Sequence, residues 1–241
     1  MASKIVSVDE GSPADRAGVA AGETLLQIDG TAIRDVLDYK FYSYDARLTL
    51  RVMEPDGETV REVRVRKREG EPLGLNFEHY LMDGMKRCSN KCVFCFIDQL
   101  PKGMRKTLYV KDDDARMSFL MGNYISMTNL SEADVNRILR MHISPVNISV
   151  QTTNPELRVK MLQNRRAGEA LKILDRFAEG GITMNCQLVV CKGLNDGAEL
   201  RRSLYDLKKL YPAVNTISVV PFGMTDHREG LYPLQPSDKP F

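Results

Sequence analysis

The sequence predicts an α/β protein in which a small β-rich domain is followed by a partial (β/α) barrel with parallel strands, and it predicts an incomplete barrel. Two observations support this fold class. The first seventy or so residues contain short strand-like stretches separated by Gly and Pro turns. After the central cysteines, strand-like runs recur about every thirty residues with helical stretches between them, the length of a βα unit. We therefore expect a β-rich domain at 1–72, a βα domain at 73–232 and a Pro-rich tail at 233–241.

Composition narrows the class of protein. The 241 residues are 43% hydrophobic, enough for a buried core, and their formal net charge is +2. The nearly balanced charge gives no reason to expect binding to nucleic acid. There is no apolar run of about eighteen residues and no signal-peptide pattern, so we expect no membrane span and a cytoplasmic location.

The β-rich domain is predicted from alternation of apolar and polar residues, which places one face of each strand in a core. A short helix is expected at 14–17, and Glu54–Glu58 is expected to be a hairpin loop. The expected strands are 5–8, 24–28, 48–53 and 60–67.

Part of this domain resembles the middle of a PDZ domain. The resemblance is carried by the run from Ile5 to Ala14, by Ala17-Gly18-Val19 and by the run from Gly22 to Gly30. The carboxylate-binding strand that normally precedes this part is absent, but the similar run Pro72-Leu73-Gly74-Leu75-Asn76-Phe77 follows it. Two interpretations remain open. A circular permutation would let the backbone at Leu73, Gly74 and Leu75 bind a peptide or protein C-terminus by strand addition; alternatively, Gly74 only turns the chain into the next domain.

The βα domain is predicted from alternating strand and helix signals. Ser131 and Asp134 form a capping box, and Asn154, Asp196 and the pair Gly180-Gly181 mark other helix ends. The expected strands are 77–82, 124–128, 147–150, 184–190 and 216–220, and the expected helices are 113–121, 131–141, 155–162, 167–179 and 196–211.

Polar residues follow four of these strands. Asn129 follows the second, Gln151 and Thr153 follow the third after Ser149, Asn195 follows the fourth, and Thr225 follows the fifth. The carboxyl ends of parallel strands meet at one rim, where ligands bind. Converging polar ends therefore predict a small-molecule site, although Asn154 and Asp196 are more typical of helix caps.

Three of the five cysteines lie within eight residues, as Cys88-x3-Cys92-x2-Cys95. A buried helical stripe would also fit these offsets, but Ser89-Asn90-Lys91 is poor helix material and nothing apolar continues the stripe. The odd number of cysteines and their clustering favour metal ligation over disulfides. Zinc would need a fourth ligand, for which His79 is a candidate, whereas a 4Fe-4S cluster on three thiolates would keep one iron open.

The cysteine motif, Phe94 just before its last cysteine, and the βα repeat behind it resemble the radical S-adenosylmethionine (SAM) superfamily over residues 77–232. More narrowly, a PDZ-like domain joined to the run from Cys92 to Arg105 is similar to a bacterial family of PDZ-containing Fe-S oxidoreductases with a domain of unknown function. The resemblance implies that Cys88, Cys92 and Cys95 bind three irons of a 4Fe-4S cluster and that SAM chelates the fourth. It also implies reductive cleavage of SAM, hydrogen abstraction from a substrate, and a low-potential electron donor such as a ferredoxin or flavodoxin.

The resemblance also implies positions for SAM contacts. Asn129 occupies the place of a Gly-Gly-Glu motif and brings no carboxylate. Ser149, Gln151 and Thr153 correspond to the region near the ribose or carboxylate, and Asn195 lies at the fourth strand end. Family members have six barrel strands and a further C-terminal part, so we expect this chain to be a fragment or a truncated product.

An alternative from another class stays open. In it the chain is a PDZ-type peptide-binding adaptor whose Fe-S or zinc site is structural, which fits the PDZ-like part and the missing carboxylate. Cys186 and Cys191, five apart on one strand, point to opposite faces, so they do not predict a second cluster.

Overall fold

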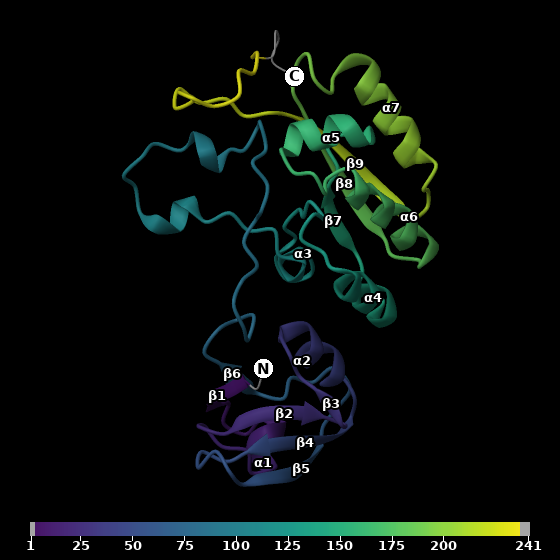
Figure 1. The fold of residues 1–241 in the computed structure, drawn as a ribbon. Coiled ribbons are helices and arrows are strands. Elements are labelled where there is room, and N and C mark those ends of the chain that lie inside the picture. Colours follow the sequence, from purple (N-terminus) through teal and green to yellow (C-terminus); the bar gives the residue numbers. More distant parts are fainter. Residues whose placement is uncertain (1–2, 237–241) are drawn as a thin grey trace. The chain divides into compact units, whose positions relative to one another are not determined.

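The structure, a computed structural model, describes residues 3–236 and contains two compact units, one ending at Met85 and one beginning at Lys86 (Figure 1). The domain limits expected from the sequence, 1–72, 73–232 and 233–241, remain predictions beside these units. Residues 237–241 of the expected tail lie outside the described residues.

The first unit is an antiparallel sheet with strand order β5-β4-β2-β1-β6, and β3 pairs with β2. Along β4, Leu48, Leu50 and Val52 are buried while the residues between them are not, which is the alternation that predicted this strand. The hairpin joining β4 to β5 also confirms its prediction. The elements are β1 (Ser3–Val8), α1 (Pro13–Arg16), β2 (Thr24–Ile28), β3 (Thr31–Ala32), α2 (Val36–Tyr42), β4 (Arg47–Met53), β5 (Val60–Arg66) and β6 (Leu75–Phe77).

Strand β6 comes last in this unit yet pairs with its first strand. Val8 lies opposite Leu75, and Ile5 opposite Phe77. Helix α2 was not expected from the sequence, although Asp35 is a regular N-cap whose side chain accepts from the amides of Leu37 and Asp38.

The second unit contains a parallel sheet with strand order β7-β8-β9 and helices around it (Figure 1). Together, the antiparallel sheet and this separate parallel sheet confirm the predicted α/β class. The elements are η1 (Ile97–Gln99), η2 (Lys106–Tyr109), α3 (Ala115–Met121), α4 (Glu132–Met141), β7 (Val146–Ser149), α5 (Pro155–Leu162), η3 (Glu169–Leu171), α6 (Lys172–Glu179), β8 (Met184–Val190), α7 (Gly197–Lys208) and β9 (Val214–Pro221).

Helix boundaries follow the local signals. The Ser131–Asp134 capping box opens α4, Asn154 caps α5 through the Leu157 amide, and Gly122 ends α3 in the left-handed region. Helix α6 is shorter than expected because a 3₁₀ turn, η3, precedes it. Asp196 occupies the N-cap position of α7 but makes no capping hydrogen bond with its side chain.

Two expected strands are absent from the described chain, so its parallel sheet has three strands rather than five. Within 124–128 only Ile125 pairs, in a single bridge to Ile148. The ladder stops there because the Ser126 amide donates to the Asp113 carboxylate and Met127 has φ 65°. The expected first strand at 77–82 was also wrong, since Phe77 ends β6 in the other sheet.

Two apolar clusters support the second unit. The larger lies between the sheet and α4, α6 and α7 and includes Ile148, Phe177 and Leu188. The smaller includes Met161, Cys191 and Phe222 at the carboxyl ends of the strands, and Cys92 and Phe94 pack against it. None of the helices among the described residues is long and apolar enough to cross a membrane.

Candidate functional site

The cysteine motif lies in a segment without regular secondary structure, and backbone hydrogen bonds hold that segment against the parallel-sheet unit. The amides of Lys91 and Val93 donate to the carbonyls of Leu162 (3.0 Å) and Met161 (2.9 Å), at the C-terminal end of α5. Carbonyls at a helix end lack partners within the helix, so they are available for this contact. The motif is thereby fixed at the rim where the parallel strands end.

Asn90, between the first two cysteines, fixes the loop by hydrogen bonds to three other residues. Its side-chain amide donates to the Ser126 hydroxyl (2.8 Å), and its side-chain oxygen accepts from Thr128 (3.0 Å) and Asn164 (2.8 Å). Asn90 is buried, and its hydrogen bonds come from three places in the chain. A buried, bonded amide of this kind fixes the path of the loop.

Asp113 extends this network under the loop. Its carboxylate accepts from the amide (2.6 Å) and hydroxyl (2.5 Å) of Ser126, and from Thr128 at 3.4 Å. Burial raises the pKa of Asp113, opposed by these hydrogen bonds and by the charge of Arg158. The interrupted strand at 124–128 therefore supports the cysteine loop through hydrogen bonds of Ser126 and Thr128 to Asn90.

On the other side, Gln99 connects the motif to the chain after β9. Its side-chain amide donates to the carbonyls of Cys95 (3.2 Å) and Gly223 (3.1 Å), and its side-chain oxygen accepts from the Thr225 amide (3.2 Å). Gln99 is fully buried. Gln99 thus joins the cysteine segment to the chain that follows β9, more than 120 residues later in the sequence.

The three thiols are partly buried and lie within electrostatic range of one another. Burial, with a smaller contribution from the Cys88 and Cys95 thiolates, raises the pKa of Cys92 to about 12, and burial also raises the pKa of Cys88. Among the residues that the structure describes, no group of three or more Cys, His, Asp or Glu side chains is gathered closely enough to hold a metal ion. As donors, three cysteine thiolates are of the soft type that Fe-S clusters and zinc take.

Lys111 lies beside the third cysteine. Its ammonium is 2.5 Å from the Asp98 carboxylate. Although burial alone would lower the pKa of Lys111, Asp98 and the Cys95 thiolate raise it above its usual value. Lys111 therefore places a positive charge beside Cys95.

Arg158 is a functional candidate that the sequence did not reveal. It is fully buried in α5, and its guanidinium donates to four backbone carbonyls, of Ser126 (2.7 Å), Ser149 (3.0 Å), Val150 (2.9 Å) and Ala167 (2.5 Å). Desolvation lowers its pKa to about 10, against the opposing charges of Asp113 and Cys92. No pattern in this short helix marks one arginine as buried.

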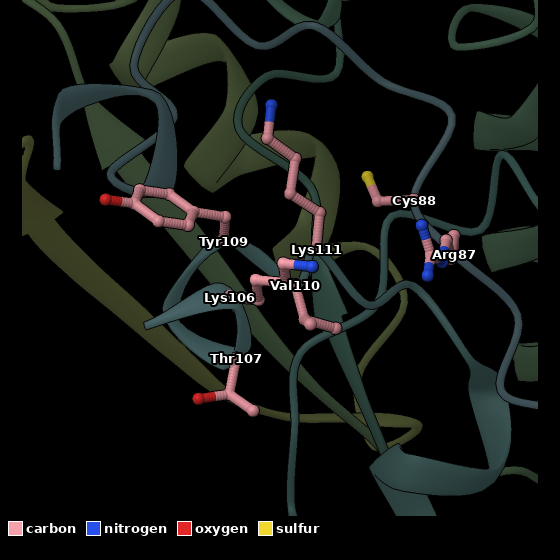
Figure 2. Close-up of a pocket in the computed structure, with 7 residues that line it drawn as sticks. All are labelled: Arg87, Cys88, Lys106, Thr107, Tyr109, Val110 and Lys111. Carbon is pink, nitrogen blue, oxygen red and sulfur yellow. The ribbon is translucent and has the colours of Figure 1, made fainter. Parts of the chain in front are cut away.

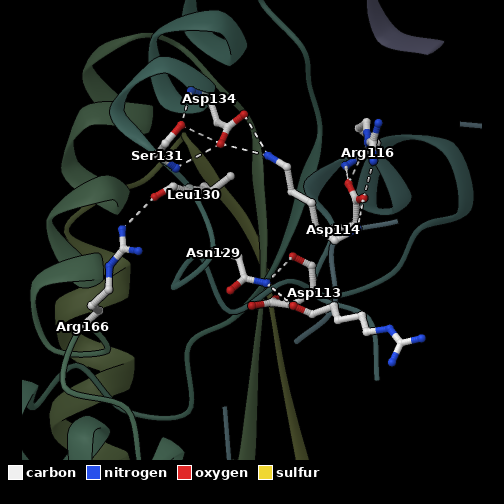
Figure 3. Close-up of polar contacts among 10 residues, drawn as sticks. Asp113, Asp114, Arg116, Asn129, Leu130, Ser131, Asp134 and Arg166 are labelled. Atoms are coloured by element: carbon white, nitrogen blue, oxygen red, sulfur yellow. Dashed lines mark hydrogen bonds and ion pairs between the residues drawn. The ribbon is translucent and has the colours of Figure 1, made fainter. Parts of the chain in front are cut away.

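Asn129 contacts the cysteine loop. Figure 3 shows Asn129 beside Asp113, and its side-chain amide donates to the Asp113 carbonyl (3.4 Å). The same amide donates to the Arg87 carbonyl (2.8 Å), and the side-chain oxygen accepts from the Ser89 hydroxyl (2.8 Å). Asn129 therefore positions the residue before Cys88. Its expected contact with SAM remains a prediction.

The other expected cofactor residues have protein partners. The Asn195 side chain bridges β7 and β8, donating to the carbonyls of Gln151 (2.7 Å) and Val189 (2.9 Å). The Gln151 side chain accepts from the Val189 amide, while the Thr153 hydroxyl donates to Asp206 on α7. Ser149 is partly buried. The structure gathers Ser149, Gln151 and Asn195 at adjacent strand ends and turns Thr153 towards α7; SAM binding by them remains a prediction.

The other two cysteines are buried. Cys186 is in the larger apolar cluster, as expected for a core residue. Cys191 lies in the smaller cluster, against which Cys92 packs. Burial raises the pKa of each to about 12, so both are neutral thiols at neutral pH.

Two cavities flank the cysteine motif. One, of about 380 Å³, is lined by Lys91, Cys92, Val93, Cys95, Asp98, Lys111, Gln163, Gly230, Leu231 and Tyr232. The other, of about 590 Å³, is lined by Arg87, Cys88, Lys106, Thr107, Tyr109, Val110 and Lys111 (Figure 2). Both volumes fall in the range of small-molecule sites.

In the first unit, the backbone at Leu73 and Gly74 leads into β6 at Leu75 and is hydrogen-bonded to the segment that follows β1. The Gly74 carbonyl accepts from the Asp9 amide (2.8 Å), and the Leu73 carbonyl accepts from the Ala14 amide (3.0 Å). Gly74 has φ +82°, and a Cβ added there would lie 2.3 Å from the Ser12 Cβ. Only glycine fits this position.

Comparison with known proteins gives two family matches. A model described as a Radical SAM-like domain matches residues 67–217, more than half of the chain, and a PDZ domain model matches residues 4–52. Among solved structures, the PDZ domain of the SdrC-like protein from Listeria innocua is similar with 19% sequence identity; the match covers 34% of this chain and 100% of that one, with a TM-score of 0.28. None of the curated proteins matches the chain.

Proposed function

Because the chain belongs to the family of Radical SAM-like domains and also contains a PDZ domain, we propose that it is a radical SAM enzyme. The observation that carries the proposal is the fixed loop with Cys88, Cys92 and Cys95 at the rim of the parallel sheet. More finely, we propose that it is an Fe-S oxidoreductase.

The proposed cofactors are a 4Fe-4S cluster and SAM, with Cys88, Cys92 and Cys95 as the protein's iron ligands. Thiolates are the ligands that such clusters take, and the three thiols lie together in one loop at the rim of the parallel sheet. The chemistry supplied by a bound cluster is one-electron reduction of SAM, which yields methionine and a 5′-deoxyadenosyl radical that abstracts hydrogen from the substrate. The electron would come from a low-potential donor such as a ferredoxin or flavodoxin.

The chain's own residues position and shield this site. Asn90 and Gln99 hold the loop backbone on its two sides, and Lys111 places a positive charge next to Cys95. Phe94 and Cys92 pack on the apolar cluster below, which limits water there. Asn129, Ser149, Gln151, Thr153 and Asn195 are proposed to lie around SAM.

The proposal is tested by anaerobic reconstitution with iron and sulfide, followed by addition of dithionite and SAM. We expect 5′-deoxyadenosine to form in proportion to the cluster-loaded protein. If a cluster-replete preparation forms no 5′-deoxyadenosine, the enzyme proposal is wrong.

Removal of one motif thiol gives a second check. Cys92→Ala is expected to abolish cluster absorbance, because two thiolates do not hold a site-differentiated 4Fe-4S cluster. Cys186→Ala is the control, since Cys186 lies in the core away from the motif and its loss should leave the absorbance per folded chain unchanged. A full 4Fe-4S spectrum in Cys92→Ala would mean that the ligands are assigned wrongly.

A second candidate function is a peptide-binding adaptor whose Fe-S or zinc site is structural. The PDZ domain fits binding of a peptide C-terminus. Gly74, where no side chain fits, supports a backbone site at Leu73, Gly74 and Leu75 for the terminal carboxylate. Metal analysis distinguishes the zinc form of the adaptor from the enzyme, because stoichiometric zinc without iron after anaerobic purification would favour the adaptor. An adaptor with a structural Fe-S site is distinguished by the absence of 5′-deoxyadenosine formation.

A further inference from the structure

The cavity of about 590 Å³ beside Cys88 is formed by two fixed walls (Figure 2). One is a short backbone ladder in which Arg87 pairs antiparallel with Asp112, and the Cys88 amide donates to the Lys111 carbonyl (3.0 Å). Asn129 further fixes this wall through the Arg87 carbonyl. Hydrogen bonds therefore fix the backbone that carries the side chains of Arg87, Cys88 and Lys111.

The opposite wall is the 3₁₀ helix η2. Its last residue, Tyr109, accepts from the Met104 amide (2.8 Å) and donates to the Pro101 carbonyl through its hydroxyl, so the ring is held in place. Lys106 and Thr107 come from the same turn and lie across the pocket from Cys88 (Figure 2). The wall combines an ammonium, a hydroxyl and an aromatic surface.

The charge of this cavity is entirely positive. Three cations line it, Arg87, Lys106 and Lys111, and no carboxylate does. Lys111 is paired with Asp98, whereas Arg87 and Lys106 have no acidic partner among residues 3–236. Two cations that line one cavity and have no counter-ion, Arg87 and Lys106, favour binding of an anion there.

The sequence segment that surrounds the cavity also carries a positive net charge. Residues 86–111 contain seven Lys or Arg and a single Asp, a formal net charge of +6, while the whole chain carries +2. Three aspartates follow, but Asp113 and Asp114 are buried and bonded to Ser126 and Arg116, and Asp112 accepts from the Asn123 side chain. These carboxylates are therefore engaged elsewhere and do not line the cavity.

We propose that this cavity binds the phosphate group of a small phosphorylated molecule, and that this molecule is the substrate. That the molecule is the substrate rests on the proposed function, since it requires a cluster at the cysteine motif. The cavity adjoins that motif through Cys88, whereas Cys92 and Cys95 line the other cavity. Phosphate is favoured because the guanidinium of Arg87 can bind two oxygens of a dianion and the ammonium of Lys106 a third. The Tyr109 ring and Val110 offer an apolar wall to the remainder of the molecule.

The test is titration of the full chain with inorganic phosphate, followed by ³¹P NMR at low ionic strength. The double variant Arg87→Ala/Lys106→Ala is expected to raise the dissociation constant about tenfold or more, the effect of losing charge-assisted hydrogen bonds. The matched control is Lys102→Ala/Arg105→Ala, which removes the same two charges from the same segment but outside the cavity. It should change the constant less than about twofold, as expected for screened surface charges.

Several results would overturn the proposal. These are no phosphate binding by the unaltered chain, equal weakening in both double variants, or binding of acetate as tight as that of phosphate. Tighter binding of polyglutamate, lost equally in both variants, would instead indicate a docking surface for an acidic protein. The titration needs neither cluster nor SAM, so phosphate binding without 5′-deoxyadenosine formation would contradict only the proposed function and the substrate role.

Discussion

At the scale of single residues, the site depends on side chains that satisfy backbone groups. Asn90, Gln99 and Arg158 are buried, and each binds backbone or side-chain partners from separate parts of the second unit. The cysteine spacing could be interpreted from the sequence because three thiols so close together along a chain are typical of metal ligation. The role of Arg158 could not, because its four partners are carbonyls, which every residue possesses.

Arg158 gives a stability prediction. Arg158→Leu should lower the free energy of unfolding by about 3 kcal/mol, because it leaves buried carbonyls without donors. Lys160→Leu is the control, since Lys160 is exposed on the same helix and its loss should cost less than about 0.5 kcal/mol. Urea unfolding of both variants measures the difference, and equal costs would show that the four hydrogen bonds do not stabilise the unit.

At the scale of elements, the strands and helices that local pattern predicts are present where the backbone pairs regularly. Strands β4, β5, β7, β8 and β9 and the capped helices α4 and α5 follow their sequence signals. The run 124–128 has the pattern of a strand, yet Asp113, which is distant along the chain, takes its Ser126 amide. A partner of that kind lies beyond the reach of a local pattern.

The close packing at Gly74 gives a prediction for the first unit. Gly74→Ala should cost about 3 kcal/mol, because it adds both an unfavourable positive φ and a clash with Ser12. Gly57→Ala shares the positive φ, +75°, but has nothing within 4 Å of the added Cβ, so it should cost only about 1 kcal/mol. Thermal or urea unfolding measures the loss of stability in both variants, and equal losses would contradict the close packing of Gly74 against Ser12.

At the scale of the whole molecule, each of the two units has an apolar core of its own. The sequence predicted an N-terminal PDZ-like part and a parallel βα part, and the family matches support both. Strand count was predicted less well, because Phe77 was assigned to the parallel sheet and lies in the antiparallel one. A three-residue strand has too short a pattern to indicate which sheet it joins.

The open iron proposed for the Cys88, Cys92 and Cys95 site is tested most directly by electron paramagnetic resonance of the reduced, reconstituted protein with and without SAM. A cluster held by three thiolates should give a spectrum that changes when SAM is added, because in the proposed site SAM would bind the fourth iron. An iron-free protein, or a reduced 4Fe-4S spectrum that SAM leaves unchanged at saturating concentration, would contradict it.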